Sequence, residues 1–165
     1  MSEPTAQIEE VSDTGDDIAF VKTLFVEYAE SLGFSLCFQG FDGELQNLPG
    51  KYARPDGNLW LARVDGALAG CVAMRPHEDG AAEMKRLFVR PGFRGHKLGS
   101  RLATTVMLYA QSRGYTALRL DTVIDQMREA QAIYKQLGFE TRAPYYDGAP
   151  VDLVFYERDL TAPIV

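Results

Sequence analysis

The sequence predicts an α/β fold of the α+β hybrid kind, in which helices cover both faces of a mixed, mostly antiparallel sheet. Two apolar runs, 59–64 and 67–74, are joined by Asp65-Gly66, which is typical of a tight β-hairpin. A third run, 83–89, ends at a proline-glycine break, and helical spacing of apolar residues begins soon after it. Near the C-terminus another helical pattern stops at a glycine, where the chain is expected to re-enter the sheet.

The N-terminal third is expected to hold one strand and one long helix. Residues 6–11 predict the strand, and the acidic, cap-forming residues 13–17 precede an apolar stripe that ends at Gly33. The segment 34–46 is rich in aromatic residues and glycine, and it either lines a small-molecule pocket or packs over an edge of the core. A short helix is expected over 44–48, and a loop over 51–57.

The remaining elements follow one another with short connections. Strands 59–64, 67–74 and 82–89 should form an antiparallel meander, with a turn at 76–80. Alternation and helical spacing then predict a helix over 98–113 that ends at Gly114, a strand over 117–123, a helix over 128–137, a loop over 143–150 and a closing strand over 151–158. No repeat or linker interrupts the pattern, so we expect one domain over 1–165.

Composition excludes several functional classes. The 165 residues carry a formal net charge of −6, which argues against a nucleic-acid partner and favours an amine-bearing one. No apolar run is long enough to span a membrane, and the acidic N-terminus is unlike a signal peptide, so we expect a cytoplasmic protein. Cys37 and Cys71 should be reduced and structural, and His77 and His96 lack the clustering that a metal site needs.

The segment 83–102 is the most informative part of the sequence. It is a strand, a glycine-containing turn and a helix N-terminus, an arrangement whose free amides and macrodipole attract an anion. Arg94, His96 and Lys97 add positive charge, so the ligand should carry phosphate, most simply a pyrophosphate. The alternative is an ordinary strand-to-helix turn with a solvated basic rim. The spacing fits neither the P-loop nor the dinucleotide-binding fingerprint.

Three features together resemble the GNAT superfamily of N-acetyltransferases, over most of the chain. They are the strand 83–89, the turn Arg94-Gly95-His96-Lys97-Leu98-Gly99, and Ala130-x-x-x-Tyr134-x-x-x-Gly138-Phe139. The family turn is [Gln/Arg]-x-x-Gly-x-[Gly/Ala]. Lys97 stands where the family prefers glycine, which should make the turn less ideal without abolishing binding, and Met127 stands where many members carry asparagine, which puts that cofactor contact in doubt.

The resemblance implies that acetyl-CoA is the co-substrate, with no metal. The strand should separate from its neighbour and bind the pantetheine arm through the backbone of Leu87, Phe88 and Val89. The pyrophosphate should lie on the turn and the helix N-terminus, which comprise Arg94, Gly95, His96, Lys97, Leu98, Gly99 and Ser100.

Catalysis requires a base for the amine and an acid for the departing thiolate. Glu83 lies at the strand start, where many family members place the base, although a charge paired with Lys85 or Arg86 is the alternative. Tyr134 matches the tyrosine that points at the cofactor sulfur as the acid in many members, and its alternative is core packing. Arg86, predicted on the opposite strand face from Glu83, either binds a substrate carboxylate or forms a surface ion pair. Tyr145, in the loop 143–150, is the second candidate for substrate binding.

The sequence therefore predicts an acetyl-CoA-dependent N-acetyltransferase that acts on a small-molecule amine by direct attack. Peptide or protein amines are alternative acceptors, and a non-catalytic acyl-CoA-binding module is the rival from another class. The presence of both Glu83 and Tyr134 favours the enzyme, since a module that only binds would need neither. The acceptor is expected to enter over 34–41 and 144–147, and a homodimer is left open.

Overall fold

The computed structural model describes residues 5–12, 15–36, 40–124 and 128–164. Within these residues a seven-stranded sheet has the order β1-β2-β3-β4-β5-β7-β6. The strands are β1 Ala6–Glu10, β2 Asn58–Val64, β3 Ala67–Pro76, β4 Ala81–Val89, β5 Ala117–Val123, β6 Glu140–Arg142 and β7 Leu153–Asp159. The helices are α1 Asp17–Ser31, α2 Phe41–Gln46, α3 Leu98–Ser112 and α4 Arg128–Gln136, with short 3-10 turns at Gly50–Tyr52, Glu78–Gly80 and Pro91–Phe93.

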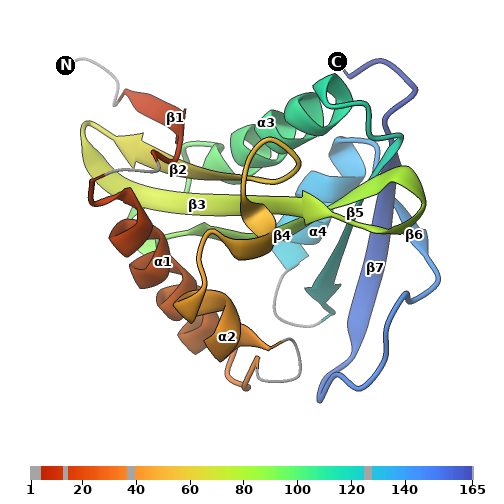
Figure 1. Ribbon diagram of the computed structural model, residues 1–165, viewed down its shortest axis with the longest axis horizontal. Coiled ribbons are helices and arrows are strands. Elements are labelled where there is room, and N and C mark those ends of the chain that lie inside the picture. The colour runs from red at the N-terminus through yellow and green to blue at the C-terminus, as the bar shows by residue number, and fades with distance from the viewer. Residues whose placement is uncertain (1–4, 13–14, 37–39, 125–127, 165) are drawn as a thin grey trace.

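Helices cover both faces of the sheet, as predicted (Figure 1). One face packs with α3 and α4 around a core that includes Met84, Leu102 and Tyr134. The other face packs with α1 and α2 around a second core that includes Phe25 and Phe41. Phe34 packs against the second core, so residues 34 and 41 follow the core-edge interpretation of the 34–46 segment. Residues 37–39 of that segment, including Cys37, lie outside the described residues.

The predicted hairpin is confirmed. Asp65 and Gly66 adopt φ of 50° and 84°, the two positive values that a type I′ turn requires, and β2 pairs with β3 in antiparallel register. The N-terminal strand is also confirmed, because β1 adds to β2 at the edge of the meander. The short helix predicted over 44–48 lies earlier, at Phe41–Gln46, and it begins after Gly40 in a left-handed conformation.

A bulge in β4 overturns the predicted orientation of Arg86. Residues 83–85 pair one to one with β3, so Glu83 and Lys85 point to the same face of the sheet. Arg86 then adopts φ of 61°, and the register with β3 shifts at this point. Because the bulge inserts an extra residue, the Arg86 side chain turns to the same face as Glu83. There its guanidinium lies 5.2 Å from the ring centroid of Phe41 in α2. The prediction that Arg86 and Glu83 lie on opposite faces was therefore wrong.

The sheet splits between β4 and β5. These neighbours are parallel, but their pairing covers only Ala81–Glu83 against Ala117–Arg119. Beyond Glu83 the two strands separate, and no strand pairing is recorded for residues 84–89 on the β5 side. Backbone N–H and C=O groups on that edge of β4 are therefore available to an extended polar ligand. Among the described residues, no helix is both long and apolar enough to cross a membrane.

Candidate active site

A long groove runs from the split in the sheet to the start of α3. It has a volume of about 610 Å³ and lies between α1, the end of β4 and α4. Its lining includes Leu87, Phe88 and Val89 of the separated strand, together with Arg94, Gly95, Lys97, Leu98 and Gly99 of the turn and helix start. The side chains of Arg94 and Lys97 are exposed, so their charges are free to meet an anionic ligand. Of the predicted turn residues, His96 and Ser100 do not line the groove.

The turn delivers backbone donors to this groove. Helix α3 begins at Leu98, and the first α-helical bond recorded there runs from the Arg101 amide to the Lys97 carbonyl, so the amides of Leu98, Gly99 and Ser100 have no acceptor inside the helix. These amides and the positive end of the helix suit a phosphate group. The groove, the unpaired edge of β4 and the free amides therefore fit a long ligand with a phosphate end and an extended polar arm.

Lys97 adopts the backbone conformation that favours glycine. Its φ is 57° at the N-cap of α3, a left-handed conformation that costs an L-residue roughly 1–2 kcal/mol. We expect Lys97→Gly to raise the melting temperature by about 2–4 °C, since the relief of strain exceeds the greater entropy that glycine loses on folding. The same variant loses a cation beside the free amides at the start of α3, so acetyl-CoA, the co-substrate that the sequence predicts, should bind several-fold more weakly.

Lys97→Ala is the matched control, because it removes the charge and keeps the strained conformation. It should weaken binding as Lys97→Gly does without raising the melting temperature. Differential scanning calorimetry and titration calorimetry measure the two effects separately. A Lys97→Gly protein that melts below the wild type would contradict the assignment of strain to this position.

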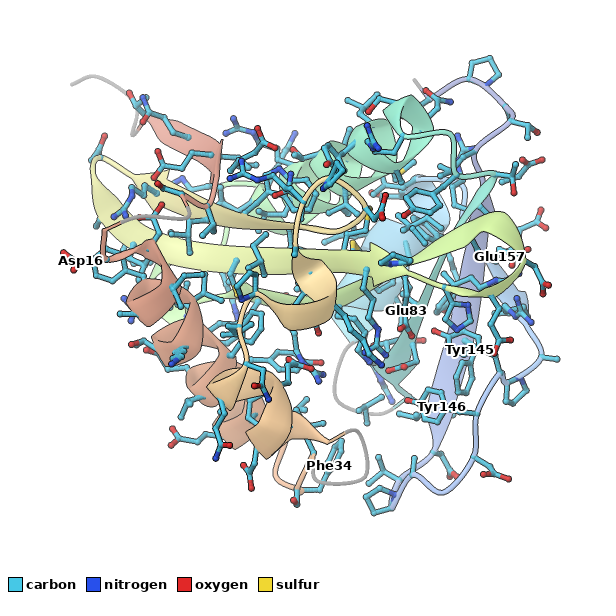
Figure 2. All side chains as sticks on the ribbon, in the orientation of Figure 1. Asp16, Phe34, Glu83, Tyr145, Tyr146 and Glu157 are labelled. Carbon is cyan, nitrogen blue, oxygen red and sulfur yellow. The ribbon has the colours of Figure 1, made fainter. Side chains whose placement is uncertain are left out.

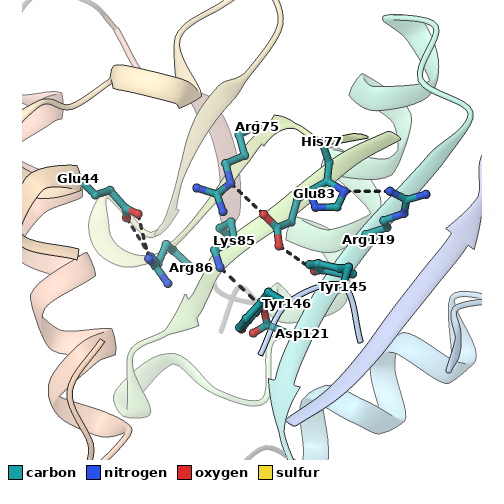
Figure 3. Close-up of polar contacts among 10 residues, drawn as sticks. All are labelled: Glu44, Arg75, His77, Glu83, Lys85, Arg86, Arg119, Asp121, Tyr145 and Tyr146. Carbon is teal, nitrogen blue, oxygen red and sulfur yellow. Dashed lines mark hydrogen bonds and ion pairs between the residues drawn. The ribbon is translucent and has the colours of Figure 1, made fainter. Parts of the chain in front are cut away.

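Glu83 lies on β4 at the point where the sheet splits, and two neighbours bind its carboxylate (Figures 2 and 3). Its Oε1 accepts a hydrogen bond of 2.9 Å from the Arg75 Nε, and its Oε2 accepts one of 2.7 Å from the Tyr145 hydroxyl. The Glu83 side chain is 1% exposed and that of Arg75 is 25% exposed. The hydrogen-bonded ion-pair partner of Glu83 is Arg75, directly opposite on β3, whereas the alternative considered from the sequence named Lys85 or Arg86.

The surroundings of Glu83 hold its carboxylate in the ionised form. Burial alone would raise the pKa of Glu83, but Lys85, Arg75 and the Tyr145 hydroxyl lower it, and the net effect is a pKa below the ordinary value of 4.5. The opposite change occurs in Tyr145, whose pKa is raised by burial and by the negative charge of Glu83. Glu83 can therefore attract an ammonium group and accept a proton, while Tyr145 remains a hydrogen-bond donor.

A second set of charges lies beside Glu83 on the same face (Figure 3). The Lys85 Nζ lies 3.8 Å from the Asp121 Oδ2, and the Tyr146 hydroxyl donates a 2.7 Å hydrogen bond to the same oxygen. Burial lowers the pKa of Lys85, although Asp121 and Glu83 oppose this change. Arg86 donates two hydrogen bonds of 2.9 Å to the carboxylate of Glu44. This ion pair is buried, so the expectation of a surface pair was wrong.

Tyr134 lies at the split in the sheet. It is 4% exposed and packs against Tyr156 and Phe139, and it also lines a cavity of about 20 Å³ with Lys85 and Asp121. Burial raises the pKa of Tyr134, so its hydroxyl stays protonated. No hydrogen bond of this hydroxyl is recorded within the described residues. The structure thus places Tyr134 both in the core and at the cavity between β4 and β5.

The loop that carries Tyr145 is held in place by a polar network. The Arg119 Nε and the Arg142 Nη1 donate hydrogen bonds of 2.6 and 2.7 Å to the Glu157 Oε1. Arg119 also contacts the His77 Nδ1 at 2.9 Å, and the His77 ring lies 4.6 Å from the ring of Tyr145. Burial and Arg119 lower the pKa of His77, whereas Glu83 raises it, and the net direction is downward. A neutral His77 therefore packs against the Tyr145 ring and accepts a hydrogen bond from Arg119.

The structure also bears on a cysteine nucleophile, on metal binding and on Met127. Cys71 is buried, with its Sγ 3.4 Å from the Arg86 carbonyl oxygen, and burial raises its pKa, so the thiol stays protonated. Within the described ranges, no group of three or more His, Cys, Asp or Glu side chains could hold a metal ion. Met127 lies outside the described residues, so its departure from the family pattern is not resolved by the structure.

Sequence reasoning did not identify Arg75 or Asp121 as residues of the site, and it named Lys85 only as an alternative ion-pair partner of Glu83. Arg75 could have been found, because it and Glu83 flank the predicted turn 76–80 and an antiparallel meander brings such residues opposite each other. The contact between Tyr146 and Asp121 had no such signal, since it joins a long loop to a strand.

A family model, a protein relative and solved structures that resemble this chain are all of acetyltransferases. Residues 23–139 match the model of the acetyltransferase (GNAT) family. The chain is 42% identical over 144 residues to an uncharacterized N-acetyltransferase of Schizosaccharomyces pombe, covering 86% of this chain and 87% of that protein. A GNAT-family acetyltransferase structure from Staphylococcus aureus superposes with a TM-score of 0.75 at 22% identity, covering 94% and 99% of the two chains. A ribosomal L7/L12 alpha-N-protein acetyltransferase in complex with coenzyme A gives 0.69 at 17% identity, covering 92% and 93%.

Proposed function

The chain belongs to the acetyltransferase (GNAT) family and is an acetyl-CoA-dependent acetyltransferase, and on that premise we propose that it acetylates the primary amine of a small molecule. The observation that carries the proposal is the position of the ionised Glu83, which lies on the acceptor side of β4 at the point where the sheet splits. We also propose that residues 1–165 form one acetyltransferase domain, because all seven strands join in a single sheet.

The long groove is proposed to hold acetyl-CoA, which supplies an activated acetyl thioester. The backbone of Leu87, Phe88 and Val89 is proposed to bind the pantetheine arm, since this edge of β4 has no recorded strand partner. The segment 94–100 is proposed to bind the pyrophosphate, through the free amides at the start of α3 and the charges of Arg94 and Lys97.

Glu83 is proposed as the base of a direct transfer. A free alkylamine is protonated at neutral pH, so the ionised carboxylate first attracts the ammonium form, which loses its first proton to solvent before it attacks the thioester. A carboxylate with a lowered pKa is a weak base for a free amine, but the nitrogen becomes strongly acidic as its bond to the acetyl carbon forms. Glu83 accepts that second proton. Transfer through an acetylated Cys71 is disfavoured because the Cys71 thiol is buried and its pKa is raised.

Tyr134 is proposed as the proton donor to the thiolate. We expect Tyr134→Phe to lower kcat by at least roughly tenfold, because the substitution removes the hydroxyl and leaves the ring packing in place. With no recorded hydrogen bond to lose, the melting temperature should stay within a few degrees of the wild type. Acyl donors with more acidic leaving thiols should be less affected, since they depend less on protonation.

Tyr156→Phe is a suitable control for the tyrosine experiment. Tyr156 packs against Tyr134, but it does not line the cavity at the split in the sheet. Steady-state release of coenzyme A thiol with two acyl donors measures the effect. A large drop in melting temperature with intact turnover would assign Tyr134 to core packing alone, and an equal loss with every donor would defeat its role as an acid.

The proposed function is tested by measuring coenzyme A thiol release over a panel of amino acids, polyamines, aminoglycosides and peptides. Turnover of small amines with kcat/KM in the usual enzyme range of about 10⁴ M⁻¹s⁻¹ or above supports the proposal. Efficient turnover of peptides alone would overturn it in favour of a peptide or protein acceptor.

A further inference from the structure

We propose that the acceptor carries a carboxylate as well as its amine, and that Arg75 binds this carboxylate in a cavity formed with α2 and the turn at Gly50–Tyr52. The acceptor class is therefore that of amino acids and similar zwitterions. This inference rests on the proposed function, because it specifies the substrate of the same site. It moves the carboxylate contact from Arg86, where the sequence had suggested it, to a residue of β3.

The cavity has the size and position that a small acceptor needs. Its volume is about 340 Å³, at the lower end of the roughly 300–1,000 Å³ that is usual for small-molecule sites. Its lining includes Gly43 and Glu44 of α2, Asn47, Lys51 and Tyr52 beyond that helix, and Arg75. The remaining wall contains further glycines, which leave room beside the charged groups.

Arg75 connects this cavity with Glu83. Its Nε–H donates to the Glu83 Oε1, and its side chain also lines the cavity. No hydrogen bond of its two terminal nitrogens is recorded within the described residues, so these N–H groups can receive a carboxylate in the paired geometry that a guanidinium favours. A ligand held in this way would lie next to Glu83, with its amine on the side of the proposed base.

Arg86 is less suited to this role. Both its Nε and its Nη2 donate to the Glu44 carboxylate, and the side chain is only 2% exposed. Binding a substrate carboxylate there would require breaking a buried ion pair, which leaves the other charge uncompensated. Arg75 is partly exposed and its terminal N–H groups have no recorded acceptor among the described residues, so Arg75 is better placed than Arg86 to bind the carboxylate.

A buried hydroxyl provides a second observation that points to a polar ligand. Tyr52 is 2% exposed and lines the cavity, and its hydroxyl lies near Glu44 without meeting hydrogen-bond geometry with any described residue. Buried hydroxyls usually have a hydrogen-bond partner. A carboxylate or amide oxygen in the cavity would supply that partner.

The charges around the site are balanced. Three carboxylates, of Glu44, Glu83 and Asp121, each pair with one cation, and these cations are Arg86, Arg75 and Lys85 in turn (Figure 3). Arg119, which Figure 3 also draws, pairs with Glu157. A site for a polyamine or an aminoglycoside would need an excess of carboxylates to compensate several ammonium groups. A balanced site suits a ligand whose own positive and negative charges are equal in number. Lys51, an exposed residue that also lines the cavity, could pair with one more negative charge.

The test compares each amino acid with its own carboxamide, which keeps the amine and the side chain and removes the negative charge. For the wild type we expect kcat/KM to be roughly 10- to 100-fold higher for the acid, the effect of a charge-assisted hydrogen bond. In Arg75→Gln the two values should come within about twofold, and Arg75→Lys should restore part of the difference. The ratio within one protein cancels any general effect of the variant on Glu83.

Arg63→Gln is the matched control. Arg63 also lies on a strand, donates from its Nε to a glutamate, Glu9, at 2.8 Å, and has a side chain that is 24% exposed. It should keep the full preference for the acid. Calorimetric binding of the amino acid and of its amide to the wild type with coenzyme A gives a readout that does not depend on turnover.

The outcomes separate this inference from the function on which it rests. A preference for the acid that disappears in Arg75→Gln and persists in Arg63→Gln supports it. Equal turnover of acid and amide by the wild type overturns the carboxylate and leaves small-molecule acetylation intact. A preference that survives in Arg75→Gln overturns the assignment to Arg75. Turnover of peptides but of no small amine overturns the proposed function, and this inference with it.

Discussion

Replacing Glu83 with glutamine is expected to lower kcat by roughly 10²–10⁴-fold, the usual contribution of a general base. Glutamine has nearly the same shape and can still meet Arg75 and Tyr145, so the wall of the acceptor site should keep its form. It cannot accept the proton of the attacking amine. The affinity for acetyl-CoA should change little, because Glu83 does not line the long groove.

The pH dependence gives a second readout of Glu83. Its pKa is lowered below 4.5 in the folded protein, so the carboxylate stays ionised above that pH and is lost only as the pH falls through the lowered value. Protonation of Glu83 should therefore not reduce the wild-type rate until the pH falls below about 4.5. Any increase in rate with pH above that value reflects deprotonation of the acceptor amine. The ion pair with Arg75 stabilises the fold over the same range, so stability should also decline only in acid. Glu83→Gln removes both dependences.

Glu9→Gln provides the control for this experiment, because Glu9 forms a comparable cross-strand pair with Arg63 at the far edge of the sheet. It should retain wild-type turnover. Stopped-time assays of thiol release from pH 4 to 9 and a melting scan of each protein complete the comparison. A Glu83→Gln protein with wild-type turnover would assign Glu83 to a structural ion pair.

Much of the fold could be predicted because local signals agree with it. Asp65-Gly66 specifies the hairpin, and Gly114 ends the long helix with φ of 87°, as a left-handed C-terminal residue does. The alternation of 117–123 also holds, with Leu118 and Leu120 buried in the core below α3. In these places a few neighbouring residues determine the backbone conformation, and tertiary contacts do not change it.

The bulge at Arg86 shows where that reasoning fails. Nothing in the local sequence marks Arg86 as left-handed, because the residue is neither glycine nor asparagine. Its conformation is stabilised by distant groups, since the guanidinium binds Glu44 of α2 and lies over the rings of Tyr28 and Phe41. A strand pattern read with period two cannot show such a reversal.

The candidate site divides in the same way. The proposed cofactor side follows from one continuous segment, 83–99, whose strand, turn and helix are adjacent in the sequence. The proposed acceptor side is assembled from β3, β4, β5 and the loop after β6, so Arg75, Asp121 and Tyr146 meet Glu83 and Lys85 only after folding. Composition gave a hint of an amine partner but could not show that the site itself is balanced in charge.

Replacing Gly99 with glutamate is expected to weaken acetyl-CoA binding by about 100-fold or more, since like charges a few ångströms apart repel by several kcal/mol in a partly desolvated site. Gly99 is the second residue of α3 and lines the end of the groove that is proposed to bind the pyrophosphate. The substitution should not unfold the protein. A carboxylate in the first turn of a helix is favourable, and a Cβ at Gly99 would meet only the flexible Cδ1 of Ile133, at 3.3 Å.

Two further variants separate charge from bulk at this position. Gly99→Gln has the same size without the charge and should lose roughly tenfold, since an added side chain crowds the amides but does not repel phosphate. Gly92→Glu adds the same charge in the preceding 3-10 turn, where a Cβ meets nothing within 4 Å and the residue does not line the groove, so it should bind almost as the wild type does. Titration calorimetry measures all three, with a melting scan to verify folding. If Gly99→Glu bound acetyl-CoA with unchanged affinity, the helix start would not be the phosphate site, and the groove beside β4 would have to bind the ligand in another orientation.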